Sequence, residues 1–307
     1  MSIGLTVYGL RPRDLLDLAV AADEVGFDAI WLGEHIALPW GYSSEHPTHD
    51  ETTPGHIAGA IVDPATELVD PLPALAAAAA VTTRLKLATG IYLLPLRHPL
   101  VTARAAQTVH EISAGRLMLG VGAGWLREEF DALGVPFQGR TAALEEALGV
   151  LRSAFAGGPF ENPGPRFPFG RVQVSPRPVD ITLVLGGNSE KALRRAVRLG
   201  DAWFSSGTPS FEDAARLRDR IARLCAEQGR DPLRCYFRTE KWDDQTIGRY
   251  HAEGMTDLVI WADQVWPSGD LADKRRSLAR AAEQLGLEPD RADGAVARGV
   301  IRHSDGS

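Results

Sequence analysis

The chain has 307 residues, of which 44% are hydrophobic and 24% are charged, an ordinary composition for a soluble globular protein. Its formal net charge of −7 argues against a nucleic-acid-binding surface, and no run of about 18 apolar residues predicts a membrane span. Two cysteines, Cys225 and Cys235, are too few for a disulfide framework, and the first residues lack the features of a signal peptide, so we expect a cytoplasmic protein.

Hydrophobic periodicity predicts short apolar strands that alternate with amphipathic helices along the chain. The predicted strands cover residues 3–8, 29–32, 85–94, 117–121, 181–185, 202–205, 235–239 and 258–261. The predicted helices cover residues 12–25, 71–81, 100–113, 142–156, 189–199, 211–228, a segment ending at 250, and 271–285.

This alternation predicts a (β/α)8 TIM barrel, with a doubly wound parallel sheet as the alternative. We expect one domain over residues 1–287, with a long polar loop at 36–70, an insertion at 157–178 and a polar tail at 288–307. Active sites of such barrels lie at the carboxyl ends of the strands, so those ends are where functional residues are expected.

A glycine-rich segment follows the fourth predicted strand. Glycines stand at positions 120, 122 and 124, and Trp125 follows them. The spacing does not fit a dinucleotide-binding fingerprint, because Trp125 and Leu126 occupy the place of its third glycine. We predict instead a bare backbone against which a flat ligand lies.

Other strand ends also carry candidate residues. His35 follows the second strand, where hydrogen bonding to a ligand and a purely structural role are about equally expected. Gly90 within the third strand predicts a bulge, whereas Arg97 and His98 are expected to pack and cap the next helix. Residues 186–189, Gly-Gly-Asn-Ser, predict either an anion site or simple capping at a helix start. No spacing of histidines, including those at 46, 49 and 56, predicts a metal site.

Four motifs in this order resemble the luciferase-like monooxygenase superfamily, and more narrowly its branch of probable coenzyme F420-dependent oxidoreductases. The resemblance covers about residues 3–265 and rests on the segments 26–35, 87–99, 115–125 and 186–189. It implies a (β/α)8 barrel that holds FMN or the deazaflavin F420 at the carboxyl ends of its strands.

The resemblance also implies roles for individual residues. His35 corresponds to the family position beside the flavin or deazaflavin ring. Gly90 and Ile91 correspond to a bulged pair that is often joined by a cis peptide bond and supports the ring. The residues expected to line the cofactor at the strand exit are Gly122, Ala123, Gly124 and Trp125. Those expected to hold its phosphate are Gly187, Asn188 and Ser189.

Two departures from the family pattern limit the expected reaction. Sugar-phosphate dehydrogenases of the family carry a glutamate where this chain has Trp125, and a tryptophan four residues after the histidine. Here the nearest tryptophan, Trp40, is five residues after His35. We therefore expect a different reaction, with His35 and Trp125 at the catalytic centre and no acid–base partner assigned.

The sequence thus predicts an F420-dependent enzyme that transfers hydride to or from a small organic substrate. An FMN-dependent monooxygenase on the same scaffold is the alternative, because both cofactors carry a ring and a phosphate. A barrel without catalysis that acts as a binding or accessory protein is the alternative of another class. The resemblance also suggests a homodimer.

Overall fold

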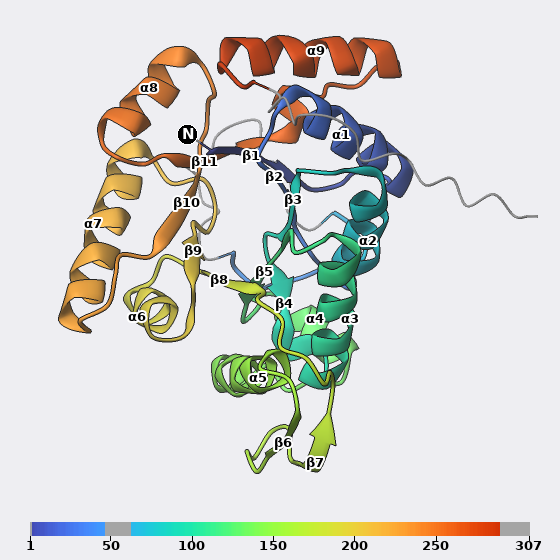
Figure 1. Cartoon of the computed structure of the whole chain (residues 1–307), viewed down its shortest axis with the longest axis vertical. Helices are drawn as coiled ribbons and strands as arrows, with labels where there is room; N and C mark the ends of the chain where they lie inside the picture. Colours follow the sequence, from blue (N-terminus) through green and yellow to red (C-terminus); the bar gives the residue numbers. More distant parts are fainter. Residues whose placement is uncertain (1, 47–62, 289–307) are drawn as a thin grey trace, which may run out of the picture.

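The computed structural model describes residues 2–46 and 63–288. Its strands form a parallel barrel with helices around the outside (Figure 1), which confirms the predicted fold class. The polar tail lies almost entirely outside the described residues, as does the middle of the long loop at 36–70.

The elements agree with the predicted alternation to within a residue or two at most ends. The strands are β1 Ser2–Val7, β2 Ala29–Leu32, β3 Lys86–Thr89, β4 Tyr92–Leu93, β5 Leu117–Gly122, β6 Pro159–Asn162, β7 Phe169–Gln173, β8 Thr182–Gly186, β9 Ala202–Phe204, β10 Arg234–Arg238 and β11 Asp257–Trp261. The helices are α1 Pro12–Val25, α2 Pro71–Val81, α3 Pro99–Ile112, α4 Arg127–Ala132, α5 Arg140–Phe155, α6 Glu190–Leu199, α7 Phe211–Glu227, α8 Asp244–Ala252 and α9 Leu271–Gln284, with 3-10 turns at Leu94–Leu96 and Ala262–Gln264.

The barrel closes where its first and last strands pair, and its third strand pairs with β5 across the short β4. β1 pairs with β11 from Ser2 opposite Asp257, and β3 pairs with β5 at Leu87 opposite Leu117. The remaining neighbours follow the order β5, β8, β9, β10 and β11. All of these pairings are parallel, so every barrel strand ends at the same mouth.

The third predicted strand is not continuous, which corrects the prediction of a single strand over residues 85–94. Ala88 pairs with Met118 of β5, whereas Tyr92 pairs with Val121. The difference in residue number between partners therefore falls from 30 to 29, which means that the third strand holds one extra residue between these two pairs. This is the bulge that Gly90 predicted. The peptide bond between Gly90 and Ile91 is cis.

The insertion at 157–178 contains an antiparallel hairpin, β6 with β7, where the sequence predicted no strand. The hairpin projects from the end of the barrel near α5 (Figure 1). Its aromatic residues pack on one another, with the rings of Phe160 and Phe169 at 5.7 Å. The alternation in each strand is too short to predict from hydrophobicity alone.

Strand side chains alternate between two cores. Ile30 and Leu32 belong to the large core between strands and helices, whereas Trp31 points inside the barrel. There the Trp31 ring stacks on Phe204 at 4.7 Å. A Cβ at Gly4 would lie 2.9 Å from the indole nitrogen, so the small residue makes room for Trp31. This aromatic layer lies directly beneath the mouth.

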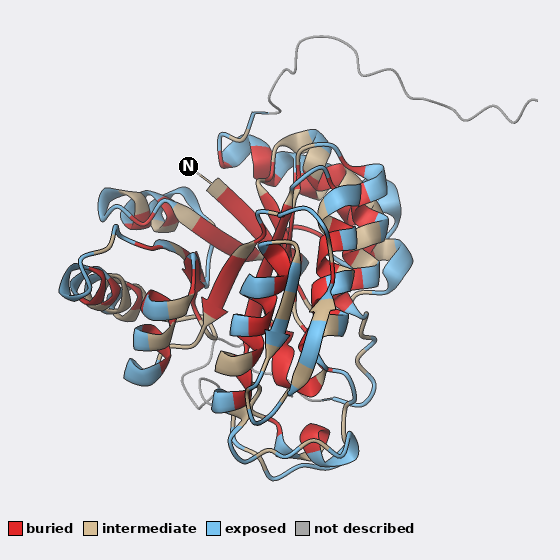
Figure 2. Ribbon diagram, turned by 60° about the horizontal axis from the view of Figure 1, so that its bottom comes forward, coloured by how far each residue is buried: buried red, intermediate tan, exposed pale blue. Residues whose placement is uncertain are grey.

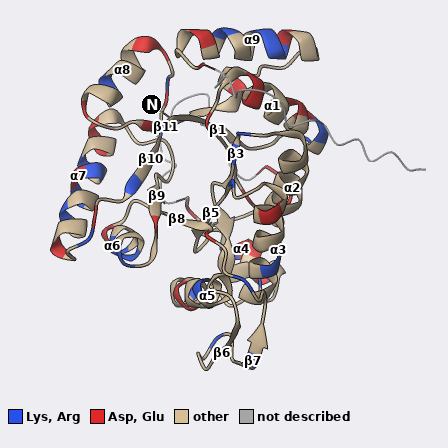
Figure 3. Ribbon diagram, in the orientation of Figure 1, with Lys and Arg blue, Asp and Glu red and all other residues tan. Residues whose placement is uncertain are grey.

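The outer helices separate their faces in the same way. Buried residues cover the strands and the inner faces of the helices, and exposed residues cover the outside (Figure 2). Charged residues of both signs are distributed over the outer helices (Figure 3). The alanine-rich helix α2 buries Leu72, Leu75, Ala78 and Ala79 between its neighbours.

Candidate active site

A cavity of about 1740 Å³ opens at the carboxyl ends of the barrel strands. Its walls come from the segments that follow β1, β2, β3, β5, β8, β9, β10 and β11. Every site residue predicted from the sequence lines it: His35, Gly90, Ile91, Gly122, Ala123, Gly124, Trp125, Gly187, Asn188 and Ser189. The described parts of the long loop also border it, through His46 and the segment 65–67.

His35 is fixed by a buried glutamate that the sequence did not identify. The Nδ1 atom of His35 lies 2.9 Å from Oε2 of Glu129, and the two residues are only 7% and 1% exposed. The other oxygen of Glu129 accepts hydrogen bonds from the backbone N–H groups of Ile36 and Ala37. A carboxylate only accepts hydrogen bonds, so Nδ1 of His35 donates and Nε2 is left for the cavity.

Glu129 was missed because it is 94 residues from His35 in sequence. Its helix, α4, begins directly after the glycine-rich exit and carries Glu128 and Glu129 in its first turn. An acidic pair at that position was the one available signal. Glu128 instead binds the beginning of the loop at 36–70. Its carboxylate accepts hydrogen bonds from the backbone and side chains of Ser43 and Ser44.

A second buried glutamate, next to His35, ties the second strand end to the third. Oε1 of Glu34 lies 2.7 Å from Nη2 of Arg97, and Oε2 accepts a hydrogen bond from the backbone N–H of Leu93. Burial raises the pKa of Glu34, and the guanidinium of Arg97 opposes that shift. His98 caps α3 by accepting from the N–H of Leu100. The structural roles predicted for Arg97 and His98 are confirmed.

The glycines of β5 and of the segment after it make room for neighbouring groups, in addition to the ligand contact predicted for them. A Cβ at Gly120 would lie 2.0 Å from the carbonyl oxygen of Thr89, and a Cβ at Gly122 would lie 2.0 Å from Cδ1 of Ile91. A Cβ at Gly124, whose φ is 78°, would meet the ring of Phe130 at 2.8 Å. These positions are bare because the bulged third strand and α4 pack against them. Ile91 lines the cavity beside them.

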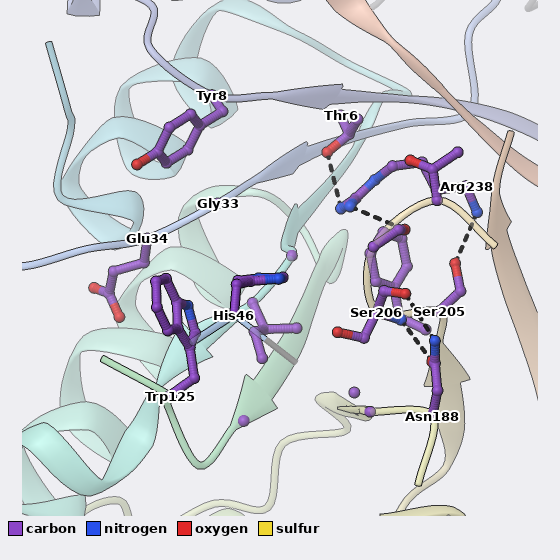
Figure 4. Close-up of a pocket in the computed structure, with 18 of the residues that line it drawn as sticks. Thr6, Tyr8, Gly33, Glu34, His46, Trp125, Asn188, Ser205, Ser206 and Arg238 are labelled. Atoms are coloured by element: carbon purple, nitrogen blue, oxygen red, sulfur yellow. Dashed lines mark hydrogen bonds between the residues drawn. The ribbon is translucent and has the colours of Figure 1, made fainter. Parts of the chain in front are cut away.

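Trp125 lies beside His46 (Figure 4) and forms an aromatic wall next to His35. Its ring meets those of His35 at 5.9 Å, Tyr42 at 6.2 Å and His46 at 4.8 Å, each edge-on. An indole N–H donates hydrogen bonds but does not exchange protons near neutral pH, so Trp125 shapes the cavity rather than moving a proton. Trp40 is 92% exposed and does not line the cavity.

The turn after β8 is held rigidly at the start of α6. The side-chain amide of Asn188 bonds both backbone groups of Ser206, at 2.8 and 2.9 Å (Figure 4). The hydroxyl of Ser189 accepts from the N–H of Ala192 and caps the helix. Both side chains therefore serve the turn itself, and the groups left for an anion are backbone N–H groups at the helix start.

A largely buried arginine on the same helix also lines the cavity. Arg195 lies on α6 and lines the cavity, with its side chain 11% exposed and its nearest carboxylate, Glu145, 4.0 Å away. Burial lowers the pKa of Arg195. Together the turn and Arg195 offer hydrogen-bond donors and positive charge to a phosphate.

Other chemistries find less support in the described residues. There, no three His, Cys, Asp or Glu side chains are grouped as metal ligands would be. No helix in the same part of the chain is long and apolar enough to cross a membrane.

Comparison with known proteins identifies the family. A family model described as luciferase-like monooxygenase matches residues 3–240. The chain is 32% identical to an F420-dependent glucose-6-phosphate dehydrogenase of Beutenbergia cavernae, over 62% of this chain and 52% of that protein.

Two solved structures share the fold. Monooxygenase RslO1 from Streptomyces bottropensis has a TM-score of 0.69 at 20% identity, covering 93% of this chain and 98% of that one. The oxygenating constituent of 3,6-diketocamphane monooxygenase of Pseudomonas putida, in complex with FMN, has a TM-score of 0.62 at 20% identity, covering 95% and 81%. The chain is therefore a member of the luciferase-like monooxygenase family, as its motifs predicted.

Proposed function

We propose that the protein is an F420-dependent oxidoreductase that transfers hydride between the deazaflavin and a small organic substrate. The observation that carries the proposal is one cavity that combines Ile91, the buried His35–Glu129 pair and the anion site before α6. A cofactor with a flat ring and a phosphate needs these features together. When bound, the deazaflavin supplies hydride transfer, and the protein supplies binding, orientation and proton handling.

Each group of the chain has a defined part in this proposal. Gly90 and Ile91 support the ring, and Gly187 with the N–H groups of α6 and Arg195 holds the phosphate. Glu129 keeps Nδ1 of His35 protonated, so Nε2 accepts a proton from a ligand or, once protonated, returns it. Trp125 covers this side of the cavity and limits access of water to His35.

An exposed arginine in the cavity wall supports the deazaflavin over FMN. FMN ends at its phosphate, whereas F420 extends beyond its phosphate into a chain of carboxylates. Arg223 of α7 lines the same cavity, is exposed, and forms no ion pair with any described residue. It is therefore available to those carboxylates. FMN stays the second candidate, because the Pseudomonas putida relative binds it on the same fold.

Fluorescence titration of the full-length protein with F420 and with FMN tests the proposal. We expect micromolar binding of F420 and weaker binding of FMN. Arg223→Gln is expected to weaken F420 alone, whereas Gly187→Asp, which places a carboxylate at the phosphate turn, is expected to weaken both. Tight binding of FMN without F420 would identify the monooxygenase, and binding of neither would favour a non-catalytic barrel.

A further inference from the structure

Arg238 carries a guanidinium into the mouth of the barrel, where it lines the cavity (Figure 4). It is the last residue of β10, and Tyr236, two positions earlier, packs inside the barrel. Side chains two residues apart in a strand share a face, which explains why Arg238 points inward. It is only 8% exposed.

The hydrogen bonds of Arg238 leave its charge unpaired. Nη1 donates to the carbonyl of Gly207 at 3.2 Å and Nη2 to the hydroxyl of Thr6 at 3.4 Å. Nε has no hydrogen-bond partner among the described residues, and none of their carboxylates forms an ion pair with the guanidinium. The guanidinium also lies 5.0 Å from the ring centre of Phe204 and 4.7 Å from that of Trp261.

Burying the unpaired charge of Arg238 costs free energy, so its presence in the cavity needs an explanation. Removing a charged group from water costs several kcal/mol when no counter-charge replaces the solvent. Two neutral hydrogen bonds and two aromatic contacts offset part of that cost. Burial lowers the pKa of Arg238 to about 10, which still leaves it charged at neutral pH. Its planar fork of donors matches carboxylates and phosphates.

The guanidinium is also close to the proposed ring site. A Cβ at Gly90 would lie 3.8 Å from the ring of Phe204, and Arg238 stands over that same ring. The phosphate turn and Arg195 belong to a different element, α6, so the cavity has two separate cationic positions.

We propose that Arg238 binds a carboxylate or phosphate group of the substrate, so that the small organic substrate of this enzyme is an anion. The inference rests on the proposed function in treating this cavity as the active site. The aromatic rings of Phe204 and Trp261 favour a substrate whose anionic group adjoins an apolar or aromatic portion.

Calorimetric titration of the full-length protein, saturated with whichever cofactor binds, tests this proposal. The probes are benzoate, inorganic phosphate and uncharged benzyl alcohol. We expect one of the anions to bind and benzyl alcohol to bind at least tenfold more weakly. Arg238→Gln should weaken the anion at least tenfold and Arg238→Lys less. Arg216→Gln is the matched control, because Arg216 lies at the rim of the cavity and already pairs with Asp213.

The outcomes separate this inference from the proposed function. If neither cofactor binds, the benzoate titration is made on the protein alone, and a loss in Arg238→Gln would still support the anion site. Equal affinity of wild type and Arg238→Gln for the anion that binds, or binding of neither anion to the wild type, would overturn the inference. So would a variant that loses cofactor affinity but keeps benzoate, because Arg238 would then serve the ring. Arg238→Met should keep or raise the midpoint of thermal unfolding, because it removes a buried charge. If Arg238→Gln and Arg238→Met both fail to fold, the role of Arg238 is purely structural and the proposal is refuted.

Discussion

Replacement of Glu129 by glutamine should reverse the tautomer of His35 without changing the shape of the site. In the native protein the carboxylate accepts from Nδ1 of His35 and from two backbone N–H groups. The amide oxygen of glutamine can keep the backbone bonds of Ile36 and Ala37. Its NH2 group then faces Nδ1, which must become an acceptor, so the proton moves to Nε2.

The expected cost follows from the loss of charge in a site that is 1% exposed. A hydrogen bond to a charged group contributes about 1.5–3 kcal/mol and a neutral one about 1 kcal/mol. Losing roughly 1 kcal/mol from each bond to Glu129 lowers the free energy of unfolding by about 3 kcal/mol. Because Nε2 can no longer accept a proton, substrate turnover should fall by about 10²–10⁴-fold, the usual contribution of a positioned acid or base.

Two measurements check this reasoning directly. Nitrogen-15 NMR of labelled histidines reports which ring nitrogen of His35 carries the proton, and urea unfolding reports the stability. Glu128→Gln is the matched control, because it makes the same change one residue away, where the carboxylate bonds Ser43 and Ser44 instead of the histidine. An unchanged His35 tautomer in Glu129→Gln would refute the assigned role of the pair.

Two further predictions concern the same wall. Gly120→Ala should lower the free energy of unfolding by about 1–3 kcal/mol or more, because its Cβ would lie 2.0 Å from a backbone oxygen. The Cβ of Gly122→Ala would meet the movable end of Ile91, so this variant should chiefly weaken cofactor binding. Thermal unfolding measures the first effect and cofactor titration the second. A hydrogen bond from Ser44 is the main cause that lowers the pKa of Glu128 to about 2. A carboxyl with a lowered pKa contributes its stabilisation above its ordinary value of 4.5, so the protection of the Ser44 amide, measured as exchange relative to the intrinsic rate at each pH, should be lost only as pH falls from there toward about 2. In Glu128→Gln the amide oxygen still accepts but does not titrate, so that protection should not change with pH over this range.

The barrel could be predicted because each strand and each helix has its own hydrophobic periodicity in the sequence. Even the short strands β9 and β10 are present within a residue of the expected positions. The bulge at Gly90 could be predicted because a glycine interrupts an apolar run. The hairpin at 157–178 could not, since its short strands pair only with each other and bury little.

The candidate site was predictable in its backbone but not in its side-chain pairings. Glycines that follow an apolar strand indicate a turn or a strand exit, so the strand exits could be found from the sequence alone. The partners of His35 and Arg238 depend on which strand ends meet, which only closure of the barrel decides. Arg238 did leave a signal: with Tyr236 it alternates inward along β10, but one short strand of mixed polarity is a weak indication of facing.

The pairings assign different kinetic effects to the two sides of the cavity. Nδ1 of His35 is committed to Glu129, so this side acts through proton transfer, and changes there should lower turnover at saturating substrate. Arg238 on the opposite side shares no hydrogen-bond partner with that pair among the described residues. If it holds an anionic group equally in the bound substrate and in the transition state, Arg238→Gln should raise KM and leave kcat nearly unchanged. A parallel fall in kcat would instead show that the guanidinium stabilises charge that develops only during hydride transfer, and would make Arg238 a catalytic residue.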